Sequence, residues 1–421
     1  MLLAAGGLLQ PCTPQQPQQP QFNLHTTSLT SLTSLAYLHA PPLRVRVCPY
    51  RLHDVVSPPS MVNRTLLRLC IVPVVLVLLS LPLLFEHRRR STDCHSFWSC
   101  VSANDPDPQK AIAPQKTVVN EITLPDGTIR FTRRNPFHTP STLVLVLTRD
   151  AGSWSRDYKA SRPRTVTDFL DLLAATKLSL PDVSLGILTA SASEFKAIKK
   201  ATKNTPLASV TILQRADIGT SFAYGDRHKP ELQDERRALL ARLRNYLMNG
   251  VLRDETHILW VDADVVEFSE NIVQTMLQHA VSRSDVGILT ARCERDTLYN
   301  YDMNAWAVAP ADLDAGNASN RATLQDLLEH RKTWVPDLIK ATKDVDLVKL
   351  DSVGGTLLYM RADLVRQGLM FPWWSAVGTG WEREGYVGLE TEGLCVLSAR
   401  MEGGGCFVLG GSHKTRHADQ G

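Results

Sequence analysis

The chain has 421 residues, enough for one large domain or for two to three average ones. Apolar residues make up 43% and charged residues 21%, which excludes a wholly disordered, collagenous or coiled-coil chain. The formal net charge is only +3, so bulk charge does not point to nucleic acid as a partner. Eight cysteines are too few for a disulfide-dense scaffold, and their spacing with histidine indicates no zinc site.

The first third of the chain differs in composition from the rest. Residues 1–65 have little periodic apolar surface and predict a disordered cytoplasmic tail, with Met61 as an alternative start. Residues 66–85 are the one apolar run long enough to span a bilayer. A cleaved signal peptide is the alternative, but charged residues 86–90 follow instead of a small-residue cleavage site, which favours an uncleaved anchor. Residues 86–141 are rich in Pro, Ser, Asp and Asn and predict a luminal stalk with a short β-like piece at 120–133.

An α/β pattern begins at residue 142. Apolar runs predict strands at 143–148, 183–190, 209–213 and 257–261, and helical spacing predicts helices at 166–178, 194–203, 231–250 and 271–280. Strands that alternate with helices indicate βαβ units in a mainly parallel, Rossmann-like sheet. We expect one domain over 142–410, a short tail over 411–421, and a ligand site beyond the carboxyl ends of the strands.

An acidic pair occupies that position. Asp262 and Asp264 directly follow the apolar run HILWV, and residues i and i+2 of an extended segment point to the same side. Two neighbouring carboxylates repel each other unless a cation lies between them, and hard oxygen ligands suit Mg²⁺ or Mn²⁺ with phosphate oxygens. The pair therefore predicts a metal that holds a phosphorylated or nucleotide-linked substrate, and the alternative is a solvated turn.

Two metal-dependent classes of enzyme place such a pair at a strand end. One is the GT-A type glycosyltransferase, in which the pair holds Mn²⁺ on the diphosphate of a sugar nucleotide. The other is the haloacid-dehalogenase-like phosphatase, in which the first aspartate is the nucleophile and the motif lies on the first strand. At least three predicted strands precede Asp262, which favours the glycosyltransferase.

Several ordered motifs resemble those of the fungal Golgi α-mannosyltransferases of mannan polymerase complexes. The helix DRHKPELQDERRALLARLRNYLMNGVL at 226–252, followed by HILWVDADVVEF, carries most of this resemblance. TRDA at 148–151, YNYDMNAW at 299–306, VGGTLLYMRADLVRQGLMFP at 353–372 and GLETEGLC at 388–395 are similar to further segments of that family. The resemblance covers about residues 142–410.

The resemblance implies a type II membrane protein of the Golgi or the endoplasmic reticulum with a luminal GT-A domain. It implies GDP-mannose as donor, Mn²⁺ as cofactor, and retaining transfer of mannose, commonly α-1,6, to mannan on N-glycans. Other mannan polymerase subunits are the implied partners. A non-catalytic scaffold subunit of such a complex is the second hypothesis, and it differs in whether the metal site is complete.

The resemblance also implies roles for individual residues. Asp262 and Asp264 would hold the metal. Four further residues are candidates to contact the donor: Arg149, Asp150, Arg236 and Arg237. Glu390 and Glu392 are candidates to bind acceptor hydroxyls or to take the proton of the attacking one. The structural alternatives are a solvated helix face for Arg236 and Arg237 and a helix N-terminal pair for the glutamates.

A histidine near the end of the domain is the family's third metal ligand. His417 matches best in spacing, with His413 as the alternative, although the polar tail around them lacks the strand-like residues expected before the ligand.

Cys395 and Cys406 are candidates to pair in an oxidising lumen, and buried free thiols are the alternative. Tryptophans 373, 374 and 381 form either a platform for acceptor sugars or part of the core.

Overall fold

The computed structural model describes residues 117–157, 162–216, 229–308, 330–379 and 385–418. The predicted tail and anchor, and most of the predicted stalk, lie outside these residues. No helix in the described ranges combines the length and the apolar composition that crossing a membrane requires.

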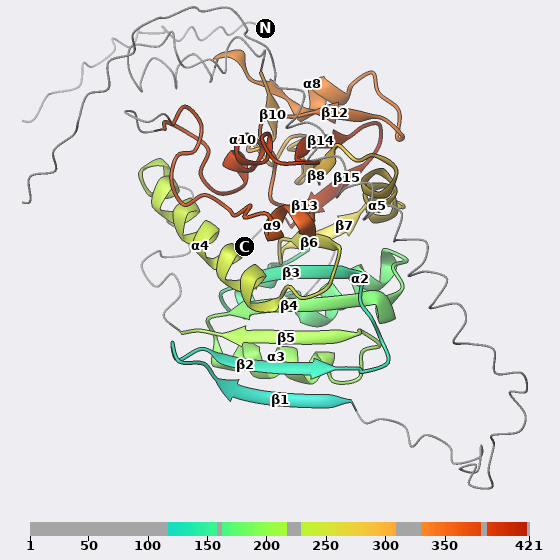
Figure 1. Cartoon of the computed structure of the whole chain (residues 1–421), viewed down its shortest axis with the longest axis vertical. Coiled ribbons are helices and arrows are strands. Elements are labelled where there is room, and N and C mark those ends of the chain that lie inside the picture. The colour runs from blue at the N-terminus through green and yellow to red at the C-terminus, as the bar shows by residue number, and fades with distance from the viewer. Residues whose placement is uncertain (1–116, 158–161, 217–228, 309–329, 380–384, 419–421) are drawn as a thin grey trace, which may run out of the picture. The chain divides into compact units, whose positions relative to one another are not determined.

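A ten-stranded sheet forms the centre of the described part of the chain (Figure 1). Its spatial order is β1-β2-β5-β4-β3-β6-β13-β8-β14-β12. Its strands are β1 (Val118–Thr123), β2 (Ile129–Arg134), β3 (Thr142–Thr148), β4 (Val183–Thr189), β5 (Ser209–Gln214), β6 (His257–Val261), β8 (Val286–Thr290), β12 (Leu347–Lys349), β13 (Leu357–Arg361) and β14 (Gly405–Leu409).

The middle of this sheet is parallel. β5, β4, β3 and β6 are neighbours that run the same way, and helices connect them as the α/β pattern predicts. β13 then enters antiparallel between β6 and β8, while β14 pairs parallel with β8. The expectation of parallel βαβ units is therefore confirmed for the centre, whereas β1, β2, β12 and β13 pair antiparallel.

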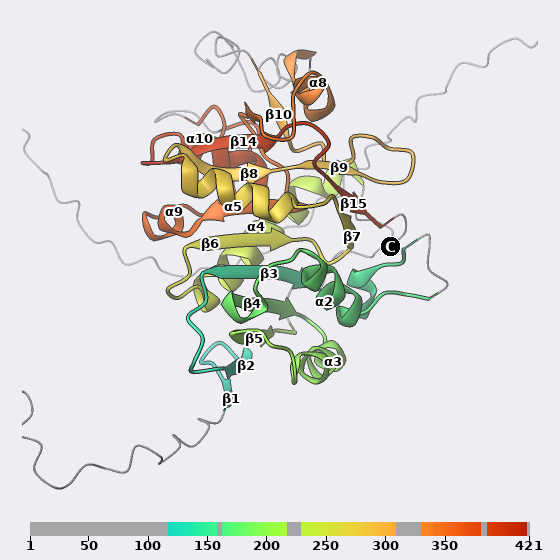
Figure 2. The same ribbon diagram turned by 90° about the vertical axis from the view of Figure 1, so that its right-hand side faces the viewer.

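Both faces of the middle of the sheet are covered, which explains why the central strands β3, β4 and β6 are largely apolar. The helices are α2 (Val166–Ala175), α3 (Ala192–Thr202), α4 (Gln233–Val251), α5 (Ile272–Ser282), α8 (Val335–Ile339), α9 (Ala362–Arg366) and α10 (Leu394–Ser398). Residues 144 and 146 of β3 face one core with α2, α3 and α5, and residues 143 and 145 face a second core with α4, α9 and α10. Figure 2 shows α2, α3 and α5 on the side nearer the viewer and α4 on the far side. A strand buried on both faces needs apolar residues at every position.

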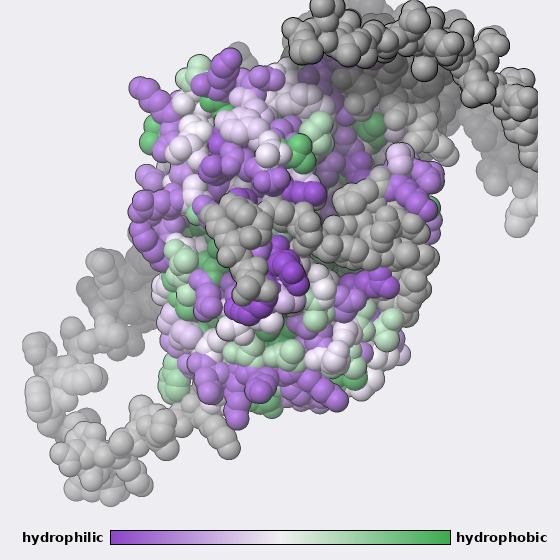
Figure 3. Space-filling view, turned by 180° about the vertical axis from the view of Figure 1, so that it is seen from behind, coloured by the Kyte–Doolittle hydropathy of each residue, from purple (hydrophilic) through white to green (hydrophobic). Residues whose placement is uncertain are grey.

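Shorter elements complete the domain. β7 (Val265–Phe268), β15 (Lys414–His417) and β9 (Arg292–Glu294) form a three-stranded sheet, and β10 (Trp306–Ala307) pairs with β11 (Thr333–Trp334). The 3₁₀ helices are η1 (Ala151–Trp154), η2 (Leu180–Asp182), η4 (Pro230–Leu232) and η6 (Glu390–Gly393). On the face seen in Figure 3, hydrophilic and apolar residues are interspersed over the described surface, in keeping with the balanced composition.

The structure differs from the expected boundaries at both ends of the domain. Part of the predicted stalk, 86–141, belongs to the sheet, because β1 and β2 form an antiparallel hairpin that pairs with β5. Part of the predicted tail, 411–421, is β15, which pairs with β7 and β9. β15 is hard to recognise from its sequence because its outward residues are charged. Lys414 and Arg416 pair with carboxylates of neighbouring strands, while Thr415 and His417 are buried.

Candidate active site

A cavity of about 780 Å³ opens at the carboxyl ends of β3, β4 and β6. In parallel sheets this edge is where ligands bind, because successive loops converge there. The residues that line it come from eight separate segments of the chain, and they include acidic, basic and apolar side chains. Of the residues proposed from the sequence, those that line the cavity are Arg149, Asp150, Arg236, Asp262, Asp264, Glu390 and His417.

The acidic pair follows β6 directly. The backbone N–H of Asp262 donates to the carbonyl of Thr356, which fixes the turn against the segment before β13. The Asp262 carboxylate accepts a hydrogen bond from Arg244 at 3.0 Å and retains 37% of its side-chain exposure because it faces the cavity. The surrounding protein desolvates this carboxylate and raises the pKa of Asp262 above its ordinary value, although the guanidinium of Arg244 opposes the effect.

His417 meets the second aspartate. Its Nε2 lies 2.9 Å from Oδ1 of Asp264, and its Nδ1 lies 2.9 Å from the carbonyl oxygen of Ala418. The N–H of Ala418 donates in turn to the carbonyl of Asp264, so the end of β15 is fixed to the acidic turn. Burial alone would lower the pKa of His417, but the Asp264 carboxylate outweighs it and raises the pKa.

His413 has a different position from His417. It is buried, as His417 is, but it does not line the cavity. The ring of Tyr301 packs against His417 with ring centroids 4.3 Å apart, which adds a second restraint on the imidazole. The histidine that reaches the acidic pair is therefore the one that the spacing favoured.

The candidate donor contacts fall into two groups. Arg149 and Asp150 follow β3 at the cavity wall, and the Asp150 carboxylate caps η1 by accepting from the N–H of Gly152 at 2.9 Å. Arg236, on α4, also lines the cavity. Arg237 does not, because its guanidinium donates to the Glu392 carboxylate at 2.8 Å and to a backbone carbonyl of the same loop.

The two glutamates of η6 are similarly divided. Glu390 lines the cavity and accepts from Nε of Arg244 at 2.7 Å. Glu392 is buried away from it and accepts from Arg237, from Nε1 of Trp306 at 3.2 Å and from a backbone N–H at 3.2 Å. These contacts make Glu392 part of the support for the loop rather than a wall of the cavity.

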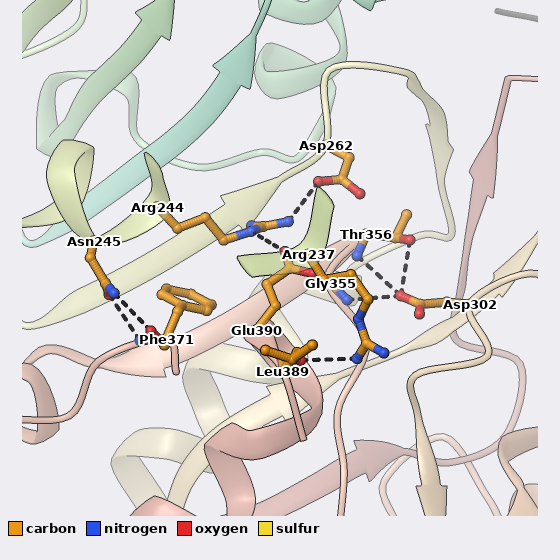
Figure 4. A network of polar contacts seen from close by, with 10 residues as sticks. All are labelled: Arg237, Arg244, Asn245, Asp262, Asp302, Gly355, Thr356, Phe371, Leu389 and Glu390. Atoms are coloured by element: carbon orange, nitrogen blue, oxygen red, sulfur yellow. Dashed lines mark hydrogen bonds and ion pairs between the residues drawn. The ribbon is translucent and has the colours of Figure 1, made fainter. Parts of the chain in front are cut away.

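Sequence reasoning gave no role to two residues of this site, Arg244 and Asp302. Arg244 joins Asp262 to Glu390 (Figure 4). Asp302 lines the cavity and accepts from the N–H groups of Gly355 and Thr356 at 2.8 and 3.2 Å. Both lie inside motifs that carry the family resemblance, ARLRNYL and YNYDMNAW, and that was the one available signal.

Asp262, Asp264 and His417 have the donor chemistry of a divalent cation site. Two carboxylates and an imidazole line one cavity, and the raised pKa of Asp262 indicates a carboxylate that a nearby cation would stabilise. Among the described residues, however, no three His, Cys, Asp or Glu side chains are already arranged around a common point. His417 and Asp264 are paired with each other, so a cation must displace the proton of this pair, because imidazole ligates a metal in its neutral form.

Known proteins with similar sequences include subunits of mannan polymerase complexes. The subunit mnn9 of Schizosaccharomyces pombe is 27% identical over 223 residues, which cover 51% of this chain and 62% of that protein. The ANP1 subunit of the mannan polymerase II complex of Saccharomyces cerevisiae is 30% identical over 196 residues, covering 44% and 36%. The chain thus spans less than two thirds of the length of these relatives.

Similarity to solved structures is more distant. The mannosyltransferase PcManGT from Pyrobaculum calidifontis, solved with GDP-Man and Mn²⁺, is 9% identical with a TM-score of 0.35, and the match covers 68% of this chain and 59% of that one. The model of the Anp1 family matches residues 143–375, more than half of the chain and most of the sheet. This match confirms the resemblance that the motifs indicate, and the chain belongs to the Anp1 family.

Proposed function

We propose that the chain is a GT-A type glycosyltransferase that moves mannose from GDP-mannose to an α-linked mannan acceptor with Mn²⁺ as cofactor. The observation that carries this proposal is the convergence of Asp262, Asp264 and His417 in one cavity at the carboxyl ends of parallel strands. The names of the relatives, which are subunits of mannan polymerase complexes, support mannose as the sugar. GDP-mannose as the donor is what the family resemblance implies.

The cavity residues divide into a donor side and an acceptor side. Asp262, Asp264 and His417 would hold the cation, which when bound supplies Lewis-acid stabilisation of the charge on the departing diphosphate. Arg149 and Arg236 add positive charge on the wall where the diphosphate and nucleoside would lie. Glu390 lines the same cavity from η6 and would orient an acceptor hydroxyl.

The first test is transfer activity. We expect the purified full-length chain to transfer mannose from GDP-mannose to an α-mannan oligosaccharide, to require Mn²⁺, and to stop when the cation is chelated. The Asp262→Asn/Asp264→Asn variant should lose roughly 100-fold or more, because it removes the charges that hold the cation. Unchanged transfer by this variant at equal folded protein would contradict the proposal. The stereochemistry and linkage of the product, expected to be α and 1,6, follow from NMR of the same reaction.

A non-catalytic scaffold subunit is the second candidate. The direct pairing of Asp264 with His417, together with the lack of a preformed three-ligand set among the described residues, favours it. A scaffold subunit would bind neither Mn²⁺ nor GDP in calorimetry, and would still associate with other family members. Binding of Mn²⁺ and GDP by the wild-type chain excludes this candidate.

The cellular setting belongs to the same proposal. The relatives are named as complex subunits, which supports assembly with other members of the family. A single-pass, type II anchor at residues 66–85 in the Golgi membrane is consistent with the apolar run there. Retention of the full-length chain in membranes after alkaline carbonate extraction is the expected result, and its release would contradict the anchor.

A further inference from the structure

One buried arginine joins the two acidic motifs of the cavity (Figure 4). Arg244 comes from the middle of α4 and its side chain is only 6% exposed. Its Nε donates to Oε1 of Glu390 at 2.7 Å and its Nη2 donates to Oδ1 of Asp262 at 3.0 Å. The two carboxylates, 128 residues apart in sequence, are therefore held by different nitrogens of one rigid, planar group.

The surroundings of the guanidinium fix its plane as well as its charge. It lies over the rings of Trp260 and Phe371, 4.9 and 5.5 Å from their centroids. Backbone closes over it at Gly355, where a Cβ atom would stand 3.0 Å from Nη2. Burial alone would lower the pKa of Arg244, and the carboxylates of Glu390 and Asp262 outweigh this effect, so the group stays charged.

Glu390, which accepts the hydrogen bond from Nε of Arg244, is buried and has an unusual backbone conformation. It is 5% exposed, lines the cavity, and has a φ of 58°, a left-handed conformation that non-glycine residues seldom adopt. Its N–H donates to the carbonyl of Pro372 at 2.8 Å. Such a conformation persists only where its surroundings hold it, and it is often found at functional sites.

The same helix offers an internal comparison. Arg237, two turns earlier on α4, makes a pair of similar length with Glu392, the other glutamate of η6. That pair does not line the cavity and does not contact Asp262 or Asp264. The two arginine–glutamate pairs both attach η6 to α4, and the one through Arg244 also reaches the acidic pair after β6.

We propose that Arg244 is a positioning residue of the transfer reaction, holding the acceptor-side carboxylate of Glu390 at a fixed place relative to the donor-side carboxylate of Asp262. This inference rests on the function proposed above. It adds that the acceptor hydroxyl and the sugar nucleotide are aligned through one shared guanidinium. If Arg244 only stabilised the fold, replacing Arg244 and replacing Glu390 would change kcat independently of each other.

The test is a double-mutant cycle with Arg244→Lys and Glu390→Gln. Lysine keeps the charge but cannot donate to both carboxylates in fixed directions, so we expect kcat to fall roughly 10- to 100-fold. If Arg244 acts through Glu390, adding Arg244→Lys to Glu390→Gln should lower kcat further by less than about threefold, since residues that act as a unit are not additive. Fully additive losses in kcat would overturn the inference.

Two further variants separate positioning from folding. Arg361→Lys alters another arginine of the same domain, which donates to four backbone carbonyls at the end of β13 away from Gly355. It should leave kcat unchanged per folded molecule. Gly355→Ala keeps every charge and adds a Cβ atom 3.0 Å from Nη2 of Arg244 and 3.2 Å from Cγ2 of Thr391, so we expect the guanidinium to shift and kcat to fall. This variant replaces Arg244→Lys in the test if Arg244→Lys does not fold. Normal kcat in Gly355→Ala with a displaced guanidinium would overturn the inference.

The outcome is distinguishable from failure of the proposed function. If the wild-type chain transfers no mannose, the proposed function and this inference fail together. If the wild type is active and the cycle is additive, the inference alone fails.

Discussion

At the scale of single residues, Asp302 shows how a loop is held against the acidic pair. Its Oδ2 accepts from the N–H groups of Gly355 and Thr356 and from the Thr356 hydroxyl at 3.1 Å. Gly354 leaves room for this carboxylate, since a Cβ atom there would stand 2.2 Å from Oδ2. The carbonyl of Thr356 then accepts from Asp262, so one carboxylate organises the turn that supports another.

Replacing this carboxylate should loosen the segment. In Asp302→Asn the amide nitrogen faces either these groups or the N–H of Asn304, which now donates to Oδ1 at 3.2 Å, and we expect the free energy of unfolding to fall by about 1–3 kcal/mol. Denaturant titration of the variant and the wild type measures this change. A variant of equal stability would mean that the segment at Gly355 and Thr356 does not depend on the carboxylate of Asp302.

At the scale of elements, η6 and α10 connect the site to the sheet. A disulfide between Cys395 and Cys406 joins α10 to β14, with Cα atoms 5.6 Å apart. The pairing proposed from the sequence is thus present, and it joins two cysteines 11 positions apart just after Glu390 and Glu392. Together with the arginine pairs from α4, it holds η6 between the helix and the sheet.

Removing this disulfide should lower stability. A Cys395→Ser/Cys406→Ser variant gains conformational freedom in its unfolded state, and we expect a loss of about 2–4 kcal/mol in the free energy of unfolding. The thermal midpoint of the wild type should fall to that of the variant when a reducing agent is added, while the variant should not respond. Equal midpoints for oxidised wild type and variant would contradict a stabilising role.

At the scale of the whole molecule, the sequence predicted the parts of the fold that have strong periodicity. The apolar runs predicted β3, β4, β5 and β6, because a strand buried on both faces must be apolar throughout. The helix α4 begins and ends within two residues of its expected bounds. The antiparallel insertion of β13 was not predicted, since its apolar run is compatible with either direction. β15 was missed because its charged residues are neutralised only by neighbouring strands distant in sequence.

The sequence predicted the site residues that lie in local motifs, and it did not predict the contacts between segments distant in sequence. Asp262, Asp264 and His417 came from a local motif and a family spacing, and the structure places them in one cavity. Arg237 and Arg244 illustrate the limit. Both lie on one helix, and the sequence offered no way to tell which guanidinium turns towards the cavity, because that depends on contacts with a loop about 150 residues away.

The central claim is that Asp262, Asp264 and His417 hold a divalent cation beside a bound nucleotide. A structure of the full-length chain grown with Mn²⁺ and GDP, with anomalous data collected at the manganese edge, tests it most directly. We predict an anomalous peak between these three side chains, with Asp264 and His417 separated from each other and the diphosphate on the side of Arg149 and Arg236. An intact pair between Asp264 and His417, with manganese and nucleotide absent from the cavity or bound elsewhere, would contradict the account.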